Sequence, residues 1–97
     1  MTKVICIHET GGPEVLSWED RNLENPTEGQ VRIKHTAIGL NMIDCYQRSG
    51  LYPIDLPMIL GSEATGVVQE IGPGVKNLST GQRVTYSGRG AYALTRR

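Results

Sequence analysis

The sequence predicts a mainly β domain with short helices. Twelve glycines and five prolines punctuate the chain at short intervals, and the segments between them are rich in Val, Ile, Thr and Tyr. Such a pattern is typical of short strands joined by tight turns. One segment also alternates apolar and polar residues, as a half-buried strand does. The 97 residues fit a single domain with one modest core.

Six segments are predicted to be strands. The clearest is 30–40, in which Val31 and Ile33 point to one face while Arg32 and Lys34 point to the other. This period of two predicts a strand with one solvated face. The other predicted strands are residues 3–8, 14–20, 63–72, 82–87 and 90–95. The predicted loops and turns are residues 11–13, 23–30, 72–75 and 79–82.

Residues 42–49 are predicted to form a short helix. Asn41 is a favourable N-cap, and Asp44 lies in the first turn, where an acid favours the positive end of the helix. Gly50 is a suitable C-terminal stop. A capped helix with a solvated polar face would explain this segment without any functional site.

The faces of this helix follow from a rotation of about 100° per residue. One face carries Asn41, Asp44, Cys45 and Arg48, and the other carries Met42, Ile43 and Tyr46. The spacing of Asp44 and Arg48 predicts an ion pair between them.

Composition excludes two classes of partner. Ten basic and ten acidic residues cancel, which gives no electrostatic basis for binding nucleic acid. No apolar run approaches the roughly 20 residues that span a bilayer. The N-terminus lacks the apolar region of a signal peptide, so we expect a cytoplasmic protein with Cys6 and Cys45 reduced. A disulfide between the two cysteines is an alternative that no spacing pattern supports.

Five stretches form a pattern that extends over about residues 3–93. They are HETGGPEVL, AIGLNMIDCYQRSGLYP, LPMILGSEATGVVQEIGPGV, GQRVTYS and GAYA. Together they resemble the N-terminal domain of zinc-independent quinone oxidoreductases related to zeta-crystallin, in the medium-chain dehydrogenase/reductase superfamily. The resemblance implies a GroES-like, partly open β-barrel over residues 1–97 that forms the substrate side of an enzyme.

Members of this family continue into a Rossmann domain that binds NADPH, and we expect that domain to be absent from this chain. No glycine-rich dinucleotide fingerprint opens a helix here. The stretch GPGVKN, residues 72–77, lacks the third glycine and reads as a turn. We therefore expect that the isolated chain does not bind NADPH tightly and is inactive.

The resemblance also implies that no metal takes part. Zinc-dependent members carry a cysteine at the position of Asn41 and a G-H-E motif in place of GSE at 61–63. A catalytic zinc needs about three ligands, and Asn and Ser replace a thiolate and an imidazole poorly. Cys45 is one turn from Asn41 but has no histidine partner. His8 and His35 are isolated on predicted strands, where we expect hydrogen-bonded structural roles.

The predicted site comes from the segment matching residues 41–52, which lines the interdomain cleft in the resembling enzymes. Negative charge grows on the acceptor oxygen as hydride arrives, and uncharged donors suit it. The predicted catalytic residues are Tyr46 and Tyr52, and the predicted cofactor-binding residues are Asn41, Asp44 and Arg48. We expect Asn41 and Tyr46 near the nicotinamide and Tyr52 near the acceptor. In the structural alternative, Tyr46 packs under the helix and Tyr52 packs on Pro53.

Three charged residues also have purely structural interpretations. Asp44 is expected to orient the helix as a cap rather than act as a base. Arg48 is expected to pair with Asp44, with a cofactor phosphate as the alternative. Glu63 is expected to accept hydrogen bonds that hold the barrel.

The resulting hypothesis is the substrate-side domain of an NADPH-dependent quinone oxidoreductase that transfers hydride directly to a quinone or enone. Two alternatives remain: a non-catalytic GroES-like binding or scaffold module, and a fragment of an enoyl-thioester reductase. The expected partners are a quinone-like small molecule, the missing Rossmann domain and a second copy of the chain, bound through an exposed apolar patch. Nucleic acid and membrane are not expected.

Overall fold

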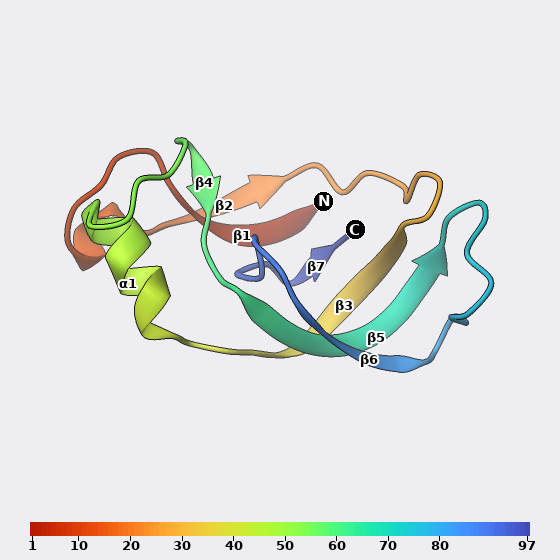
Figure 1. Ribbon diagram of the computed structural model, residues 1–97. Helices are drawn as coiled ribbons and strands as arrows, with labels where there is room; N and C mark the ends of the chain where they lie inside the picture. Colours follow the sequence, from red (N-terminus) through yellow and green to blue (C-terminus); the bar gives the residue numbers. More distant parts are fainter.

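Two antiparallel sheets form the body of the molecule in the computed structural model, which describes residues 1–97. The first sheet has the order β2-β1-β4, and the second has the order β6-β5-β3-β7. Figure 1 shows the first along the top of the view and the second along the bottom. The strands are β1 (Thr2–Ile7), β2 (Ser17–Arg21), β3 (Val31–Ile38), β4 (Met58–Ile59), β5 (Glu63–Ile71), β6 (Arg83–Ser87) and β7 (Thr95–Arg96).

The C-terminal segment joins the two sheets on one side. Ala93 forms an isolated bridge with Val4 of β1, and Tyr92 accepts a backbone hydrogen bond from Ile5 at 2.9 Å. A few residues later, β7 pairs with β3 of the other sheet. No comparable link closes the rest of the circumference, so the predicted partly open, GroES-like β-barrel is confirmed.

Most predicted strands are confirmed within a residue or two, and three segments differ. Residues 13–15 form a 3₁₀ turn, η1 (Pro13–Val15), because proline at its first position presets a helical φ angle. The predicted strand at 14–20 therefore begins only at Ser17. The predicted strand at 90–95 is reduced to the bridge at Ala93 and the short β7. Strand β4 was not predicted, because two residues show no period.

The core is small, since only 14 of the 97 residues are buried. Val4, Cys6 and Ala93 form its central cluster, against which Ile59 packs. Cys6 is a free thiol within this cluster, and Cys45 on the helix is a free, half-buried thiol. A core of this size leaves many large apolar side chains uncovered.

The single α-helix, α1 (Met42–Ser49), has the predicted bounds. Gly50 ends it in the left-handed conformation, with φ of 88°, as the sequence predicts. The helix lies at one end of the barrel, at the left of Figure 1, and no strand packs closely along it. Neither α1 nor any other helix is long and apolar enough to cross a membrane.

His35 ties β3 to the C-terminal segment and to β6. Its Nδ1 donates to the Ala93 carbonyl at 2.6 Å, and the Tyr86 hydroxyl donates to its Nε2 at 2.8 Å. These bonds use the neutral ring and confirm the predicted structural role. Burial lowers the pKa of His35, with the positive charge of Arg96 acting in the same direction and the Ala93 bond opposing them.

This arrangement predicts a loss of stability in mild acid. The unfolded chain gains a proton on His35 below about pH 6.5, whereas the folded chain takes it up only at lower pH. The contribution of neutral His35 to the free energy of unfolding should therefore be fully present above that pH. It should decrease as the pH drops toward the lowered pKa of His35 in the folded chain. Denaturant unfolding between about pH 7 and pH 5 should show this slope in the wild type. His35→Gln keeps a donor and an acceptor but does not titrate, so an equal slope in that variant would contradict the assignment.

Candidate functional site

Helix α1 is turned with its polar side inward. Asp44 and Gln47 are buried, with Asp44 only 4% exposed. Met42 is 64% exposed and Ile43 is 38% exposed. The prediction of a solvated polar face is therefore wrong, because Asp44 finds its partners inside the molecule. The apolar side of the helix faces outward instead.

The carboxylate of Asp44 is held by two donors on one oxygen. Its Oδ2 accepts from the backbone N–H of Asn41 at 3.1 Å and from the hydroxyl of Tyr92 at 2.6 Å. Its Oδ1 is buried without a partner. Burial, the hydrogen bond to Asp44 and the negative charge of Asp44 all raise the pKa of Tyr92. Tyr92 therefore keeps its proton and remains a donor, and Asp44 has the predicted orienting, capping role.

Arg48 does not pair with Asp44, so that predicted ion pair is wrong. Its Nε donates instead to the carbonyl of Gly11 at 3.2 Å, while the Gly11 N–H donates to the Arg48 carbonyl at 2.9 Å. The reason is geometric, since Asp44 points inward to Tyr92 and the turn at residues 10–12 passes beside Arg48. This double contact fixes the C-terminal end of α1.

The two predicted catalytic tyrosines lie together. The ring centroids of Tyr46 and Tyr52 are 5.3 Å apart with the planes tilted by 60°, and Tyr52 N–H donates to the Tyr46 carbonyl at 3.2 Å. Tyr52 is 46% exposed, and Tyr46 is half-buried. Neither hydroxyl takes part in a hydrogen bond within the chain. Two uncharged donors are thus free on one wall, and the Tyr52 ring contacts the Tyr46 ring in a tilted arrangement.

Asn41 lies exposed at the N-terminus of α1, beside the GSE segment. The connection is a backbone hydrogen bond from Gly39 N–H to the Glu63 carbonyl, at 3.1 Å. The segment that leads into α1 and the GSE segment at residues 61–63 are therefore neighbours. The side chain of Glu63 is exposed and takes part in no hydrogen bond, so its predicted role in holding the barrel is wrong.

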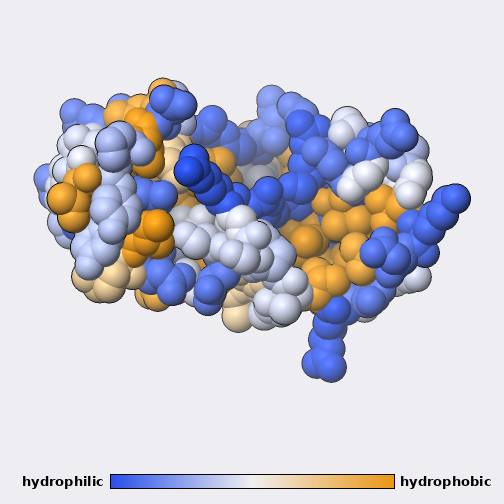
Figure 2. All heavy atoms as spheres, viewed as in Figure 1, coloured by the Kyte–Doolittle hydropathy of each residue, from blue (hydrophilic) through white to orange (hydrophobic).

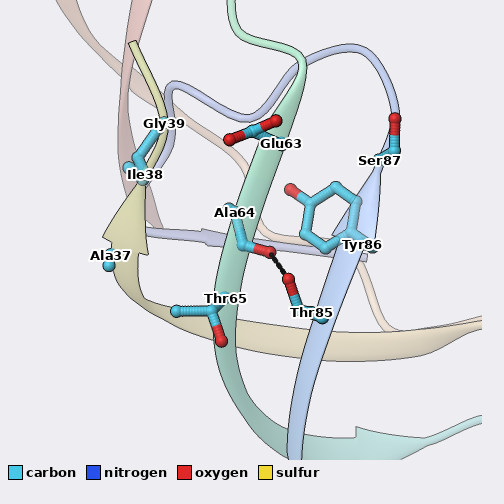
Figure 3. A pocket seen from close by; sticks show the side chains of 9 residues that line it. All are labelled: Ala37, Ile38, Gly39, Glu63, Ala64, Thr65, Thr85, Tyr86 and Ser87. Atoms are coloured by element: carbon cyan, nitrogen blue, oxygen red, sulfur yellow. Dashed lines mark hydrogen bonds between the residues drawn. The ribbon is translucent and has the colours of Figure 1, made fainter.

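A cavity of about 670 Å³ lies at the edge shared by β3, β5 and β6. Figure 3 shows the Glu63 carboxylate and the Tyr86 ring above Ala64 and Thr85, and the Thr85 hydroxyl donates to the Ala64 carbonyl at 3.2 Å. None of the predicted site residues lines this cavity. They form a separate wall at the helix end of the barrel, and the chain itself supplies no opposite wall.

Apolar surface surrounds that wall. Leu40, beside Asn41, is 82% exposed and lines a fully apolar groove of about 190 Å³ with Trp18 and Leu94. Figure 2 shows apolar surface in orange over the helix end and again between the two sheets. The predicted exposed apolar patch is present, while self-association through it remains a prediction.

A second polar cluster lies at the C-terminal end of β1 and on β2. Cys6, His8 and Glu19 place possible ligand atoms within 4.8 Å of one another, so the view of His8 as isolated is wrong. His8 Nε2 donates to Glu19 at 2.5 Å, as a structural histidine does. A cation already lies among them, because Arg21 Nη2 is 3.1 Å from Cys6 Sγ and 3.3 Å from Glu19 Oε1. Burial raises the pKa of Cys6, which disfavours the thiolate that metals bind.

The alcohol dehydrogenase GroES-like domain family matches residues 27–95. The chain belongs to this family.

Several relatives match this GroES-like domain over nearly its whole length. Quinone oxidoreductase 1 of Escherichia coli is 46% identical over 96 residues, which are 96% of this chain and 29% of that protein. The 2-haloacrylate reductase of a Burkholderia species is 42% identical over 88 residues, 87% of this chain and 26% of that protein. The crystal structure of E. coli quinone oxidoreductase complexed with NADPH has a TM-score of 0.91 at 44% identity, covering 96% of this chain and 29% of that one. The chain thus spans less than a third of the length of these relatives.

Sequence reasoning missed Tyr92 as part of the site. The stretch GAYA indicates only a strand, and Tyr92 is 48 residues from its partner Asp44. Gly61 holds the Tyr92 ring in place, since a Cβ on Gly61 would lie 2.6 Å from Tyr92 Cδ1 and 2.7 Å from its backbone nitrogen. The glycine also has φ of 102°, which L side chains rarely adopt.

This close approach predicts that Gly61→Ala is strongly destabilising. Gly81 provides a matched control, because its φ is 91° but nothing lies within 4 Å of a Cβ there. Gly81→Ala should cost about 1–2 kcal/mol from the backbone alone. Gly61→Ala should cost roughly 1–3 kcal/mol more, because Tyr92 must shift. Denaturant unfolding would contradict this account if the two variants were equally stable.

Proposed function

We propose that this chain is the substrate-side domain of an NADPH-dependent quinone oxidoreductase. The observation that carries the proposal is the pair of phenols, Tyr46 and Tyr52, with unbonded hydroxyls on a wall that the chain leaves uncovered. The similarity to E. coli quinone oxidoreductase, whose structure is complexed with NADPH, supports it. When bound, NADPH supplies the hydride for the reduction.

Asn41 is the residue of this chain that fits the cofactor best. It is exposed at the N-terminus of α1, and its uncharged amide matches a carboxamide as donor and acceptor. Asp44 and Arg48 fit less well, because Tyr92 and Gly11 already engage them. We therefore assign Asp44 and Arg48 to holding the helix against which the cofactor lies.

Tyr46 and Tyr52 supply hydrogen bonds to the acceptor oxygen. Negative charge develops on that oxygen during reduction, and preorganised donors stabilise it most strongly where water is excluded. The contact between the two rings fixes their relative position before the acceptor arrives. A protonated phenol on this wall also supplies the proton that completes the reaction. No metal is required in this scheme.

The outward apolar face of α1 explains why a second domain is needed. The relatives are more than three times as long as this chain, and Met42 and Leu40 are exposed here. Burying these side chains against a cofactor domain would create the dry cleft in which the tyrosines act. The domain that completes the cleft is the Rossmann domain expected from the resemblance.

Activated alkenes are a second acceptor class, supported by a different relative. The similarity to a 2-haloacrylate reductase favours an alkene conjugated to a carbonyl or carboxylate group. Its reduction also places negative charge on an oxygen, so the same phenols serve it. Quinones and activated alkenes should therefore be compared as acceptors.

The proposal predicts NADPH-dependent reduction of a simple quinone by the full-length gene product that contains residues 1–97. The purified 97-residue chain should oxidise NADPH at a negligible rate, because it offers only one wall of the cleft. Preincubation with a strong chelator should leave the rate of the full-length product unchanged. The decrease in NADPH absorbance measures the rate in all three experiments.

Three results would count against this reading. A full-length product without turnover of quinones or activated alkenes would favour the scaffold alternative. Turnover confined to enoyl thioesters would favour the other alternative. A rate for the short chain close to that of the full-length product would show that no second wall is needed.

The roles of the phenols predict a specific kinetic change. Tyr46→Phe combined with Tyr52→Phe should lower kcat of the full-length product by about a hundredfold, since both acceptor-oxygen donors are lost. Binding of NADPH should change much less. Steady-state kinetics with varied acceptor measures this, and a double variant with the wild-type kcat would exclude the tyrosines as donors.

A further inference from the structure

We infer that Tyr92 is a positioning residue for the wall formed by α1, a role that rests on the proposed function where catalysis is concerned. Through its hydroxyl it holds Asp44, and through Asp44 it holds Asn41 and the first turn of the helix. The observation is a hydrogen bond of 2.6 Å between residues 48 positions apart.

The helix has few other attachments. No strand packs closely along it, and its apolar residues Met42 and Ile43 face outward rather than into a core. Its C-terminal end is fixed by the double contact between Arg48 and Gly11. At the N-terminal end, the one side-chain hydrogen bond to another part of the fold is that between Asp44 and Tyr92. The orientation of the wall therefore depends on this bond.

Tyr92 is itself anchored firmly enough to serve as a reference point. Its backbone N–H donates to the Leu60 carbonyl at 2.9 Å, and its carbonyl accepts from Ile5 of β1 at 2.9 Å. Gly61 packs against one edge of the ring too closely for any side chain. The hydroxyl of Tyr92 thus holds the first turn of the helix at a fixed place relative to the barrel.

The hydrogen bond from Tyr92 stabilises a buried carboxylate, Asp44, that has no cation beside it. Asp44 is 4% exposed, no Lys, Arg or His pairs with it, and its Oδ1 has no partner. A buried carboxylate that loses one of its two donors is costly to keep in place. Without the Tyr92 hydroxyl, the first turn should move toward water and carry Asn41 with it.

The test compares Tyr92→Phe with Tyr86→Phe in two measurements. Both substitutions remove one bonded phenol, but Tyr86 bonds to His35 of β3 and makes no hydrogen bond to α1. In the 97-residue chain, amide hydrogen exchange within α1 should accelerate roughly ten- to a hundredfold in Tyr92→Phe and remain unchanged in Tyr86→Phe. Amides of β5 should be protected equally in both variants and in the wild type.

Kinetics of the full-length product give the second measurement. Below the unfolding temperature, Tyr92→Phe should lower kcat by roughly ten- to a hundredfold, because a shift of about 1 Å in the wall is enough for such a loss. Tyr86→Phe should retain the wild-type kcat, although it also loses a hydrogen bond. Adding Tyr92→Phe to Asp44→Asn should lower kcat no further than Asp44→Asn alone, since the two residues act through one bond.

Each outcome decides the inference. Wild-type exchange in α1 of Tyr92→Phe, or equal effects of the two tyrosine substitutions, would overturn it. Additive losses in the double variant would do the same. If the full-length product reduces no acceptor at all, the proposed function fails, while the exchange measurement still decides whether Tyr92 positions the helix.

Discussion

A buried carboxylate without a neighbouring cation is the constraint on which the rest of the site depends. Asp44 satisfies one oxygen with the Asn41 amide and the Tyr92 hydroxyl, and its negative charge lies at the positive end of α1. The Asn41 amide is a local partner within the first turn, whereas the Tyr92 hydroxyl is available only if the polar side of the helix faces inward. The orientation of the whole helix follows from where this one side chain can be satisfied.

Turning the polar side inward places apolar and aromatic side chains on the outside. Met42 and Leu40 are exposed, and Tyr46 and Tyr52 present hydroxyls with no partner in the chain. A small core elsewhere in the barrel does nothing to cover them. These features agree with a domain that forms one side of an interdomain cleft, as the lengths of the relatives also indicate.

The sequence predicted the elements of this fold better than their orientation. The bounds of α1 and the glycine that ends it follow from local capping chemistry at Asn41 and Gly50, and β3 follows from its alternation of apolar and polar residues. The direction of Asp44 could not be predicted, because its partner Tyr92 is distant in sequence and GAYA carries no signal of the contact. The ion pair between Asp44 and Arg48 was wrongly predicted for the same reason, because the contact between Asp44 and Tyr92 was not foreseen.

Other features that the sequence did not predict also depend on contacts between distant parts of the chain. Strand β4 exists because Met58 and Ile59 pair with β1, not because two residues show a pattern. The cluster of Cys6, His8, Glu19 and Arg21 forms only when β1 and β2 align. The tyrosine pair was predicted from a resemblance, and the structure brings the two rings together without assigning their roles.

In a full-length product with a second domain, the outward face of α1 should become an interior wall. Oxidative labelling of methionines, read by mass spectrometry, tests it most directly by comparing the 97-residue chain with the full-length gene product. Met42 should be labelled readily in the short chain and protected in the full-length product, while half-buried Met58 serves as the internal reference. Equal labelling of Met42 in both proteins would contradict the account, because the face would then remain open to solvent.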